Sequence, residues 1–228
     1  IDLKKEANQP FLSFDKNLAL VFNGEIYNFK ELYNSLGIKP ETESDCEIII
    51  DLYLLYPIDY FISLLDGVFS FIIYDSRKDI INVGRDPFGV RPLFCSEDYN
   101  FFSSELKQIH NLTDKKIIQF KPGHYLTIKN GEINLVKYFL LTKFTLPLCN
   151  QYKNFYDERS FYMAIIKYNL IAAVKKRLQS DRPIACLLSG GLDSSLITCI
   201  VNKLIKSNTK LETFSIGLKG STDLVFAK

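Results

Sequence analysis

The feature that most restricts the fold is a glycine loop between an apolar strand and a helix. The loop reads LLSGGLDSSLI, from Leu187 to Ile197. A strand is expected before it at Ile184–Leu188, and a helix after it from about Ser194 to Lys206. A second strand is expected at Thr213–Gly217. Because a helix between two strands makes them parallel, this order predicts the opening of a parallel α/β sheet.

The composition of the loop is that of an anion-binding site without a lysine. Backbone N–H groups at a strand-to-helix turn attract an anion, and the helix dipole adds to the attraction. Gly190 and Gly191 let the backbone approach a phosphate closely, and Ser189, Ser194 and Ser195 supply hydroxyl donors. The lysine-containing P-loop pattern is absent. An ordinary glycine-rich turn is the alternative, and the complete string favours nucleotide binding over it.

One carboxylate in the loop limits the chemistry further. Asp193 would repel a polyphosphate unless a divalent cation lay between them, and Mg²⁺ bridges carboxylate and phosphate oxygens. The loop therefore suits a leaving pyrophosphate with Mg²⁺, as in adenylation. It resembles the SGGxDS signature of the ATP pyrophosphatase, or PP-loop, family.

The first two-thirds of the chain is predicted to be β-rich with two or three helices. Leu18–Phe22 is an apolar strand, which the dipeptide Asn23-Gly24 is expected to end in a tight turn. A short helix, FKELYNSL, is expected between an Asn28 cap and a Gly37 stop.

Further along, the sequence predicts one capped helix and two hairpins. Ser44 and Glu47 have the spacing of a capping box ahead of the apolar run IIIDLYLLY. Alternating apolar residues on either side of turn residues predict hairpins. Their strands are Val68–Tyr74 with Ile80–Val83, and Tyr125–Ile128 with Ile133–Val136.

A change of pattern marks a domain boundary. Residues 139–157 show no clean period and contain Pro147, which is typical of an interdomain linker. After it, residues 158–179 predict a long helix. Its candidate core residues are Phe161, Ile165, Tyr168, Leu170 and Ala172. We therefore predict a first domain at 1–140, a linker at 141–157 and a second domain at 158–228.

Composition argues against several classes of protein. The 28 Lys and Arg residues nearly balance the 26 Asp and Glu residues, so neither nucleic acid nor an anionic membrane is expected as the main partner. The apolar runs are too short and interrupted to span a bilayer. The five cysteines are widely spaced and form no CxxC pair. Reduced thiols in a cytoplasmic protein are therefore expected, rather than a zinc site.

Strings in the β-rich part extend the resemblance. They are NGEIYN at Asn23–Asn28, SDCE at Ser44–Glu47, GRDPFGVRPLF at Gly84–Phe94 and SSELK at Ser103–Lys107. Together with the SGGLDSS loop, in this order and spacing, they closely resemble the glutamine-dependent asparagine synthetases. The resemblance implies an α+β class II glutamine amidotransferase domain, a four-layer αββα sandwich of the N-terminal-nucleophile type. The start of an α/β PP-loop domain would follow.

The resemblance also implies site residues. The Asn23 side-chain amide and the Gly24 N–H would form the oxyanion hole, and Glu25 and Asp45 would hold the α-ammonium of glutamine. Asp193 would bind Mg²⁺. The implied ATP contacts are Leu188, Ser189, Gly190, Gly191, Asp193, Ser194, Ser195 and Ile216.

Two further motif residues are expected to be structural. Cys46 has no histidine near it in sequence, and the resembling family does not use this position, so a packed thiol is expected. The segment RDPFGVRPL is interpreted as a structural turn in which Arg85 and Asp86 form an ion pair.

The ends of the chain depart from the family pattern. Glutaminase chemistry in the family uses a cysteine at the first position, with its own α-amino group as base. Here the chain runs from Ile1 to Lys228, so the sequence is interpreted as a fragment, truncated at both ends, that completes neither half-reaction.

The parent enzyme would adenylate aspartate with ATP and Mg²⁺, and ammonia from glutamine would then give asparagine. Its partners would be the small molecules glutamine, aspartate and ATP, and a homodimer is left open. Two alternatives remain. One is a related β-lactam-forming or peptide-cyclising synthetase with another acyl substrate. The other is a non-catalytic remnant that binds ATP or a protein partner.

Overall fold

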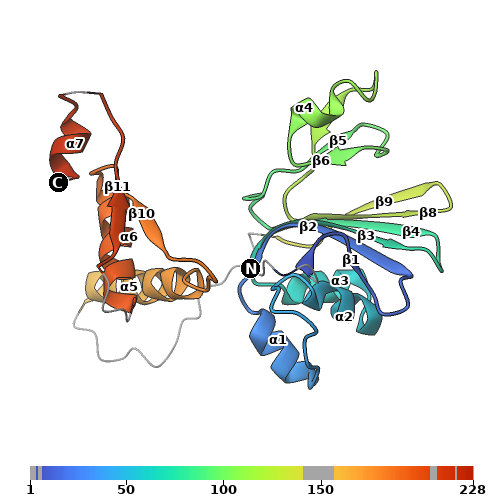
Figure 1. Cartoon of the computed structure of the whole chain (residues 1–228), viewed down its shortest axis with the longest axis horizontal. Coiled ribbons are helices and arrows are strands. Elements are labelled where there is room, and N and C mark those ends of the chain that lie inside the picture. The colour runs from blue at the N-terminus through green and yellow to red at the C-terminus, as the bar shows by residue number, and fades with distance from the viewer. Residues whose placement is uncertain (1–3, 5–6, 141–156, 206–209, 219, 228) are drawn as a thin grey trace. The chain divides into compact units, whose positions relative to one another are not determined.

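The computed structural model describes residues 4, 7–140, 157–205, 210–218 and 220–227. The chain divides into two compact units, Ile1–Leu146 and Pro147–Lys228 (Figure 1). Apart from Asp157, the predicted linker lies outside the described residues, and the predicted domain limits stay predictions. No helix among the described residues is both long enough and apolar enough to cross a membrane.

The first unit is built on a six-stranded antiparallel sheet. Its strand order is β1-β2-β3-β4-β8-β9. The bounds are β1 Phe11–Leu12, β2 Leu18–Ile26, β3 Gly67–Asp75, β4 Ile80–Arg85, β8 His124–Lys129 and β9 Glu132–Lys137. The pairs β3/β4 and β8/β9 are the two hairpins that the sequence predicts, so both hairpins are confirmed.

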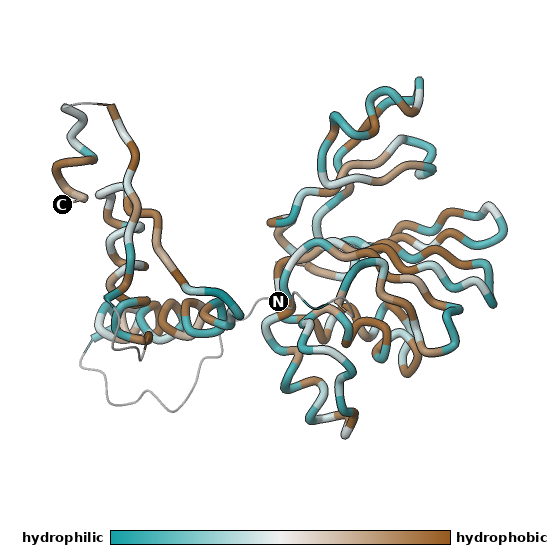
Figure 2. Tube along the Cα trace, in the orientation of Figure 1, coloured by the Kyte–Doolittle hydropathy of each residue, from teal (hydrophilic) through white to brown (hydrophobic). Residues whose placement is uncertain are grey.

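Three helices pack on one face of this sheet (Figure 1). They are α1 Phe29–Leu36, α2 Ile48–Leu55 and α3 Ile58–Leu64. Alternate residues of β2 face them, because side chains in a strand point to opposite faces in turn. Leu18, Leu20 and Phe22 are therefore buried in one cluster with Leu52 of α2 and Phe61 of α3. Many hydrophobic residues of this unit lie in these strands and helices (Figure 2).

A second, smaller sheet completes the first unit. Its order is β6-β5-β7, and the short helix α4 adjoins it. The bounds are β5 Phe94–Ser96, β6 Phe102–Ser103, α4 Leu106–Ile109 and β7 Ile117–Gln119. A separate core cluster contains Val83 of β4, Leu126 of β8 and Cys95 of β5, so it joins the two sheets. The layering is the expected αββα, with the fourth layer reduced to α4.

The turn predicted at Asn23-Gly24 is wrong, because β2 runs straight through it to Ile26. Gly24 lies opposite Phe69 of β3, and its φ is +150°. A Cβ on Gly24 would lie 2.0 Å from the carbonyl oxygen of Val68. The glycine is therefore needed for close approach of two strands, and not for a turn.

The capping box is also wrong. The helix α2 begins at Ile48, and the Ser44 hydroxyl lies 3.2 Å from the Cys46 Sγ instead of capping the helix. The Glu47 carboxylate accepts hydrogen bonds from the backbone N–H and the hydroxyl of Thr42. Glu47 thus stabilises the loop that precedes α2. In a capping box, its side chain would instead accept from the backbone N–H of Ser44.

The predicted short helix is confirmed, but Asn28, its expected cap residue, binds other groups. The helix α1 spans the predicted FKELYNSL and ends at Gly37, whose φ is +67°. The Asn28 side chain makes no capping bond. It donates to the Leu64 carbonyl and accepts from the Asp66 N–H, so it joins the start of α1 to the segment after α3.

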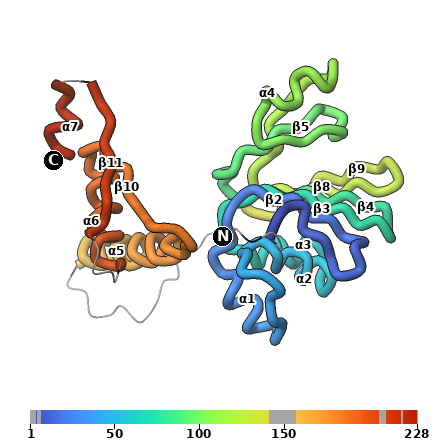
Figure 3. Tube along the Cα trace, in the orientation of Figure 1, coloured from blue at the N-terminus to red at the C-terminus, as the bar shows by residue number. Residues whose placement is uncertain are grey.

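The second unit has the predicted strand–loop–helix–strand order. Its elements are α5 Glu158–Lys176, β10 Ala185–Leu187, α6 Leu192–Leu204, β11 Glu212–Phe214 and α7 Thr222–Phe226. The strands β10 and β11 pair in parallel, with Cys186 opposite Thr213, and α6 connects them (Figure 3). The prediction of a parallel α/β opening is confirmed.

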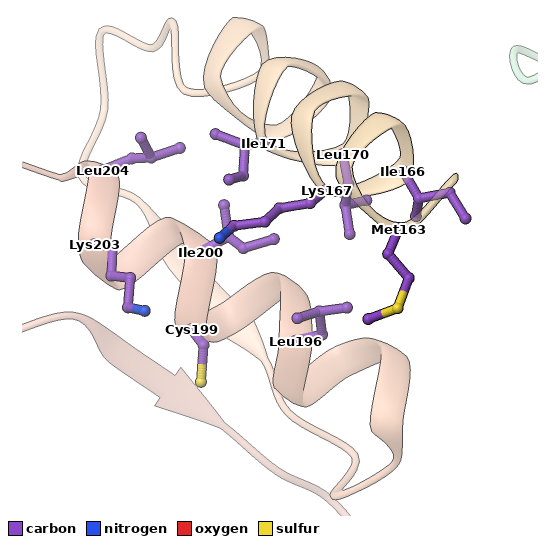
Figure 4. Close-up of a pocket in the computed structure, with 10 residues that line it drawn as sticks. All are labelled: Met163, Ile166, Lys167, Leu170, Ile171, Leu196, Cys199, Ile200, Lys203 and Leu204. Carbon is purple, nitrogen blue, oxygen red and sulfur yellow. The ribbon is translucent and has the colours of Figure 1, made fainter. Parts of the chain in front are cut away.

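The long helix α5 is less buried than its sequence predicts. Among its described residues only Val174 is buried, and Tyr168 and Ala172, two of its expected core residues, are exposed. Apolar side chains of α5 and α6 instead line a cavity of about 420 Å³ (Figure 4). Ile166 and Leu170 line it from α5, and Leu196 lines it from α6.

The RDPFGVRPL segment is structural, as predicted, but the expected ion pair is wrong. Arg85 is 1% exposed and Asp86 is also buried, yet no ion pair within 4 Å joins them among the described residues. Each side chain binds backbone groups instead. The Arg85 guanidinium donates to the carbonyls of Gly89, Arg91 and Phe120. The Asp86 carboxylate accepts from the N–H groups of Phe69, Phe88, Val90 and Arg91.

We predict that Asp86→Ala lowers the free energy of unfolding of the first unit by about 3 kcal/mol, because four N–H groups lose their acceptor. Urea unfolding followed by circular dichroism measures the loss. Asp114→Ala is the control, since Asp114 is an exposed aspartate of the same unit, and it should cost less than about 0.5 kcal/mol. An unchanged urea midpoint in Asp86→Ala would contradict the structural role.

Candidate functional site

One polar cavity gathers most of the residues expected to bind glutamine. Its volume is about 260 Å³. Its walls come from the segment before β1, from β1 and β2, and from the loop that precedes α2. The lining residues are Ala7, Gln9, Phe11, Phe22, Asn23, Gly24, Ser44, Asp45 and Cys46. The structure therefore brings Asn23, Gly24 and Asp45 together, although Asp45 is distant from the other two in the sequence.

Asp45 supplies a buried carboxylate to this cavity. The residue is 2% exposed, and its Oδ2 accepts a hydrogen bond of 2.7 Å from the N–H of Ile26. That bond ties the loop before α2 to the end of β2, two residues beyond Gly24. A carboxylate held in this way is suited to binding an ammonium group that enters the cavity.

Asn23 lines the same cavity and also a second cavity of about 120 Å³, which it shares with Ser70 of β3 and Phe102 of β6. Its backbone lies opposite Ser70 of β3, and its side chain forms no hydrogen bond with any of the described residues. A carboxamide has two N–H donors, so the donors of Asn23 are available to a bound oxygen atom.

Glu25 is the expected glutamine-site residue that does not line the cavity. Its side chain is 39% exposed, and its Oε1 lies 3.9 Å from a guanidinium nitrogen of Arg91. This pair is long and partly solvated, so it is weak. In the structure, Glu25 is thus directed towards Arg91, and the cavity is formed without it.

Cys46 lines the cavity as a packed thiol, as expected. It is 4% exposed, and burial raises the pKa of its thiol to about 11. The neighbouring Asp45 carboxylate also raises the pKa, whereas contact with the Ser44 hydroxyl lowers it. Since the thiolate is the reactive form, Cys46 is a poor nucleophile near neutral pH.

The glycine loop of the second unit is braced by its own serines. The Ser189 and Ser194 hydroxyls lie 2.9 Å apart, and the Ser194 hydroxyl donates to the Gly191 carbonyl at 3.1 Å. Gly190 has a φ of +81°, and a Cβ on it would lie 2.4 Å from the Asp223 carbonyl oxygen of α7. A Cβ on Gly191 would meet only the Ser189 hydroxyl, at 3.5 Å. The space beside the Gly191 Cα is therefore open, and the Gly191 N–H donates to the Ser189 hydroxyl at 3.5 Å.

Asp193 stands in the first turn of α6 and is exposed. The first N–H groups of a helix have no partner within it, and the helix dipole is positive there, so an anion is favoured beside Asp193. No group of three or more His, Cys, Asp or Glu residues that could hold a metal occurs within the described part of the chain. A cation here would take one carboxylate and the oxygens of a phosphate. That donor set fits Mg²⁺ in nucleotide sites.

Leu188 and Ile216, the expected adenosine contacts, lie at one edge of the β10/β11 sheet. Each follows the carboxyl end of its strand, the edge where open α/β sheets bind ligands. The Leu188 N–H donates to the Phe214 carbonyl, and the Ser215 hydroxyl donates to the Leu188 carbonyl. Ile216 is 98% exposed, so it is not a core residue of the described fold.

Sequence reasoning missed Gln9 as a cavity residue. No motif surrounds Gln9 in the sequence. It reaches the cavity because its side chain bonds to β2, where its Oε1 accepts from the Phe22 N–H at 2.7 Å. Pro10, which follows Gln9, was the available signal. Proline cannot continue the backbone ladder between β1 and β2, so a side chain has to bind β2 there.

Two family models match separate regions of this chain. The family model described as a glutamine amidotransferase domain matches residues 1–118. The family model described as asparagine synthase matches residues 166–228. The first region contains the polar cavity, and the second contains the glycine loop.

Curated relatives match along most of the chain. The "Probable asparagine synthetase [glutamine-hydrolyzing]" of Schizosaccharomyces pombe is 38% identical, over 96% of this chain and 42% of its own length. The "Asparagine synthetase [glutamine-hydrolyzing]" of Homo sapiens is 39% identical, over 92% of this chain and 41% of its own length. The chain therefore spans about two-fifths of the length of these relatives.

Two solved structures resemble part of this chain. One is glutamine phosphoribosylpyrophosphate amidotransferase from B. subtilis, complexed with ADP and GMP. It has a TM-score of 0.52 and 25% identity, over 60% of this chain and 33% of that one. A structure titled as the allosteric regulatory enzyme of purine biosynthesis has a TM-score of 0.51 and 25% identity, over 59% of this chain and 32% of that one. Because a family model matches more than half of its residues, this chain belongs to the glutamine amidotransferase domain family.

Proposed function

We propose that the complete gene product is a glutamine-hydrolysing asparagine synthetase. It would use ATP to adenylate the side-chain carboxylate of aspartate, with release of pyrophosphate. Ammonia from glutamine would then displace AMP from the β-aspartyl-AMP intermediate and give asparagine. The observation that carries the proposal is the presence, in one chain, of the Asn23–Gly24–Asp45 cavity and the SGGLDSS loop. The names of the curated relatives support it.

In the amidotransferase unit, the proposal concerns the amide carbon of glutamine. Attack on this carbon converts the carbonyl oxygen into an oxyanion, which the Asn23 amide and the Gly24 N–H would stabilise. The carboxylate of Asp45 would hold the α-ammonium. We also assign Glu25 to that ammonium, which requires its side chain to leave Arg91.

In the second unit, the proposal concerns ATP. Backbone N–H groups and hydroxyls at the start of α6 would bind the phosphates, with apolar contacts to the adenosine at the sheet edge. The residues assigned are Leu188, Ser189, Gly190, Gly191, Asp193, Ser194, Ser195 and Ile216. Asp193 would hold Mg²⁺, which when bound offsets the charge of the leaving pyrophosphate. The nearly balanced charge of the chain supports small-molecule partners, and its widely spaced free cysteines support a cytoplasmic location, with a homodimer left open.

We predict that Asn23→Ala, in the complete gene product, lowers glutamine-dependent turnover about 150-fold and leaves ammonia-dependent turnover within about threefold. The loss of one oxyanion donor costs on the order of 3 kcal/mol in the barrier to glutamine hydrolysis alone. Steady-state asparagine formation with each nitrogen source measures both rates. Asn100→Ala, at an exposed asparagine of the same unit, is the control. Equal losses with both nitrogen sources would show that Asn23 supports the fold and not the oxyanion.

We predict that Asp193→Ala abolishes the aspartate-dependent exchange of labelled pyrophosphate into ATP in the complete gene product. Without the carboxylate, the polyphosphate loses the protein ligand that we assign to its cation. Asp181→Ala changes an exposed aspartate outside the loop and should leave the exchange unchanged. Undiminished exchange in Asp193→Ala would contradict the assignment of Asp193 as a ligand of Mg²⁺.

We predict that iodoacetamide modifies Cys46 of the native chain much more slowly than the exposed Cys199 at pH 7.5. The pKa of about 11 leaves little thiolate at that pH, and the Cys46 rate should rise about tenfold per pH unit up to pH 9.5. Peptide mapping by mass spectrometry measures both sites.

Cys46→Ser should also leave glutamine-dependent turnover of the complete gene product within about threefold. A complete loss of that turnover would identify Cys46 as the nucleophile and overturn its assignment as a packed thiol.

A further inference from the structure

The backbone ladder between β1 and β2 ends at Phe11, which itself lines the cavity. Its last pair is Phe11 opposite Leu20, and the same register carried two residues further places Gln9 opposite Phe22. Pro10 lies between, and proline has no N–H to continue a ladder. The Gln9 side chain takes over, because its Oε1 accepts from the Phe22 N–H at 2.7 Å.

Two side chains thus hold the edge of β2 on either side of Gly24. Gln9 binds the N–H of Phe22, and the Asp45 carboxylate binds the N–H of Ile26, also at 2.7 Å. Successive N–H groups of a strand point to opposite edges, so the N–H groups of residues 22, 24 and 26 share one edge. The N–H of Gly24 therefore points to the cavity edge, between two N–H groups that are already bound.

The opposite edge of β2 supports the same direction for the Gly24 N–H. Gly24 lies across from Phe69 of β3. The Phe69 N–H donates to the Asp86 carboxylate, and its carbonyl accepts from the Asp86 N–H. Both backbone groups of Phe69 are therefore directed away from β2, as in a non-hydrogen-bonded pair. Phe69 therefore offers the Gly24 N–H no acceptor on that side.

We propose that Gln9 is a positioning residue for the oxyanion donor. Its Oε1 fixes the Phe22 N–H, and this bond holds the next N–H on the same edge, that of Gly24, towards the cavity. Gln9 thereby acts on the reaction through Gly24 without contacting the reacting atoms. The inference rests on the proposed function, since it assigns to Gly24 the oxyanion of glutamine hydrolysis.

Two substitutions of similar length separate the acceptor from the rest of the side chain. Gln9→Met removes the acceptor, and Gln9→Glu keeps one. In the complete gene product, Gln9→Met should lower kcat with glutamine about tenfold, less than the loss of a donor itself, and leave KM for glutamine within about twofold. A split of this kind is expected because the oxyanion exists only in the transition state. Ammonia-dependent turnover should not change, and Gln9→Glu should restore kcat to within about threefold of the wild type.

Hydrogen–deuterium exchange provides a readout that needs no activity. Exchange in the peptide covering residues 18–26, followed by mass spectrometry, should be faster in Gln9→Met and near the wild-type rate in Gln9→Glu. Unchanged exchange in Gln9→Met would overturn the hydrogen bond on which the proposal rests.

The kinetic outcomes are equally distinct. An unchanged kcat in Gln9→Met, an equal loss with ammonia, or a loss in Gln9→Glu as large as in Gln9→Met would each overturn the positioning role. A wild-type protein that uses ammonia but not glutamine would overturn the proposed function, and the exchange experiment would still decide whether Gln9 holds Phe22.

Discussion

The first unit depends on a buried pair of opposite charges that bind the backbone and not each other. Asp86 holds both backbone groups of Phe69, and Arg85 holds carbonyls of the following turn and of Phe120 just after β7. Buried charges are costly unless hydrogen bonds satisfy them, and here the acceptors and donors are peptide groups. The two residues thereby join β3 and β4 to the second sheet, and they fix the backbone directly across from Gly24.

The polar cavity depends on that constraint and on the absence of a Cβ at Gly24. With Phe69 turned towards Asp86, β2 approaches β3 so closely at Gly24 that no Cβ fits. Two side chains then bind backbone N–H groups of β2 on either side of Gly24. Gln9 binds the N–H of Phe22, and Asp45 binds the N–H of Ile26. The same compact packing buries Cys46 and raises the pKa of its thiol. A thiol can therefore line the cavity while remaining protonated near neutral pH.

The second unit relies on local geometry more than on burial. Hydroxyl contacts between Ser189 and Ser194 shape the glycine loop, and Gly190 permits the close approach of α7. Few of its apolar side chains are buried among the described residues, and those of α5 and α6 line an open cavity (Figure 4). The loop nevertheless keeps an open face at Gly191 and the start of a thirteen-residue helix beside it. An anion site of this kind needs oriented N–H groups more than it needs a large core.

The sequence by itself determined what depends on neighbours along the chain. The hairpins, the short helix α1 and the strand–loop–helix–strand order all follow from local periodicity and turn residues, and the structure contains them. Tertiary structure decided the rest. Asn23-Gly24 has the local preference of a turn, but pairing with β3 extends the strand through it. Ser44 and Glu47 have the spacing of a capping box, but Glu47 binds Thr42 instead. Gln9 enters the cavity only through the register of β1 against β2, because the sequence does not encode which distant N–H groups a side chain will meet.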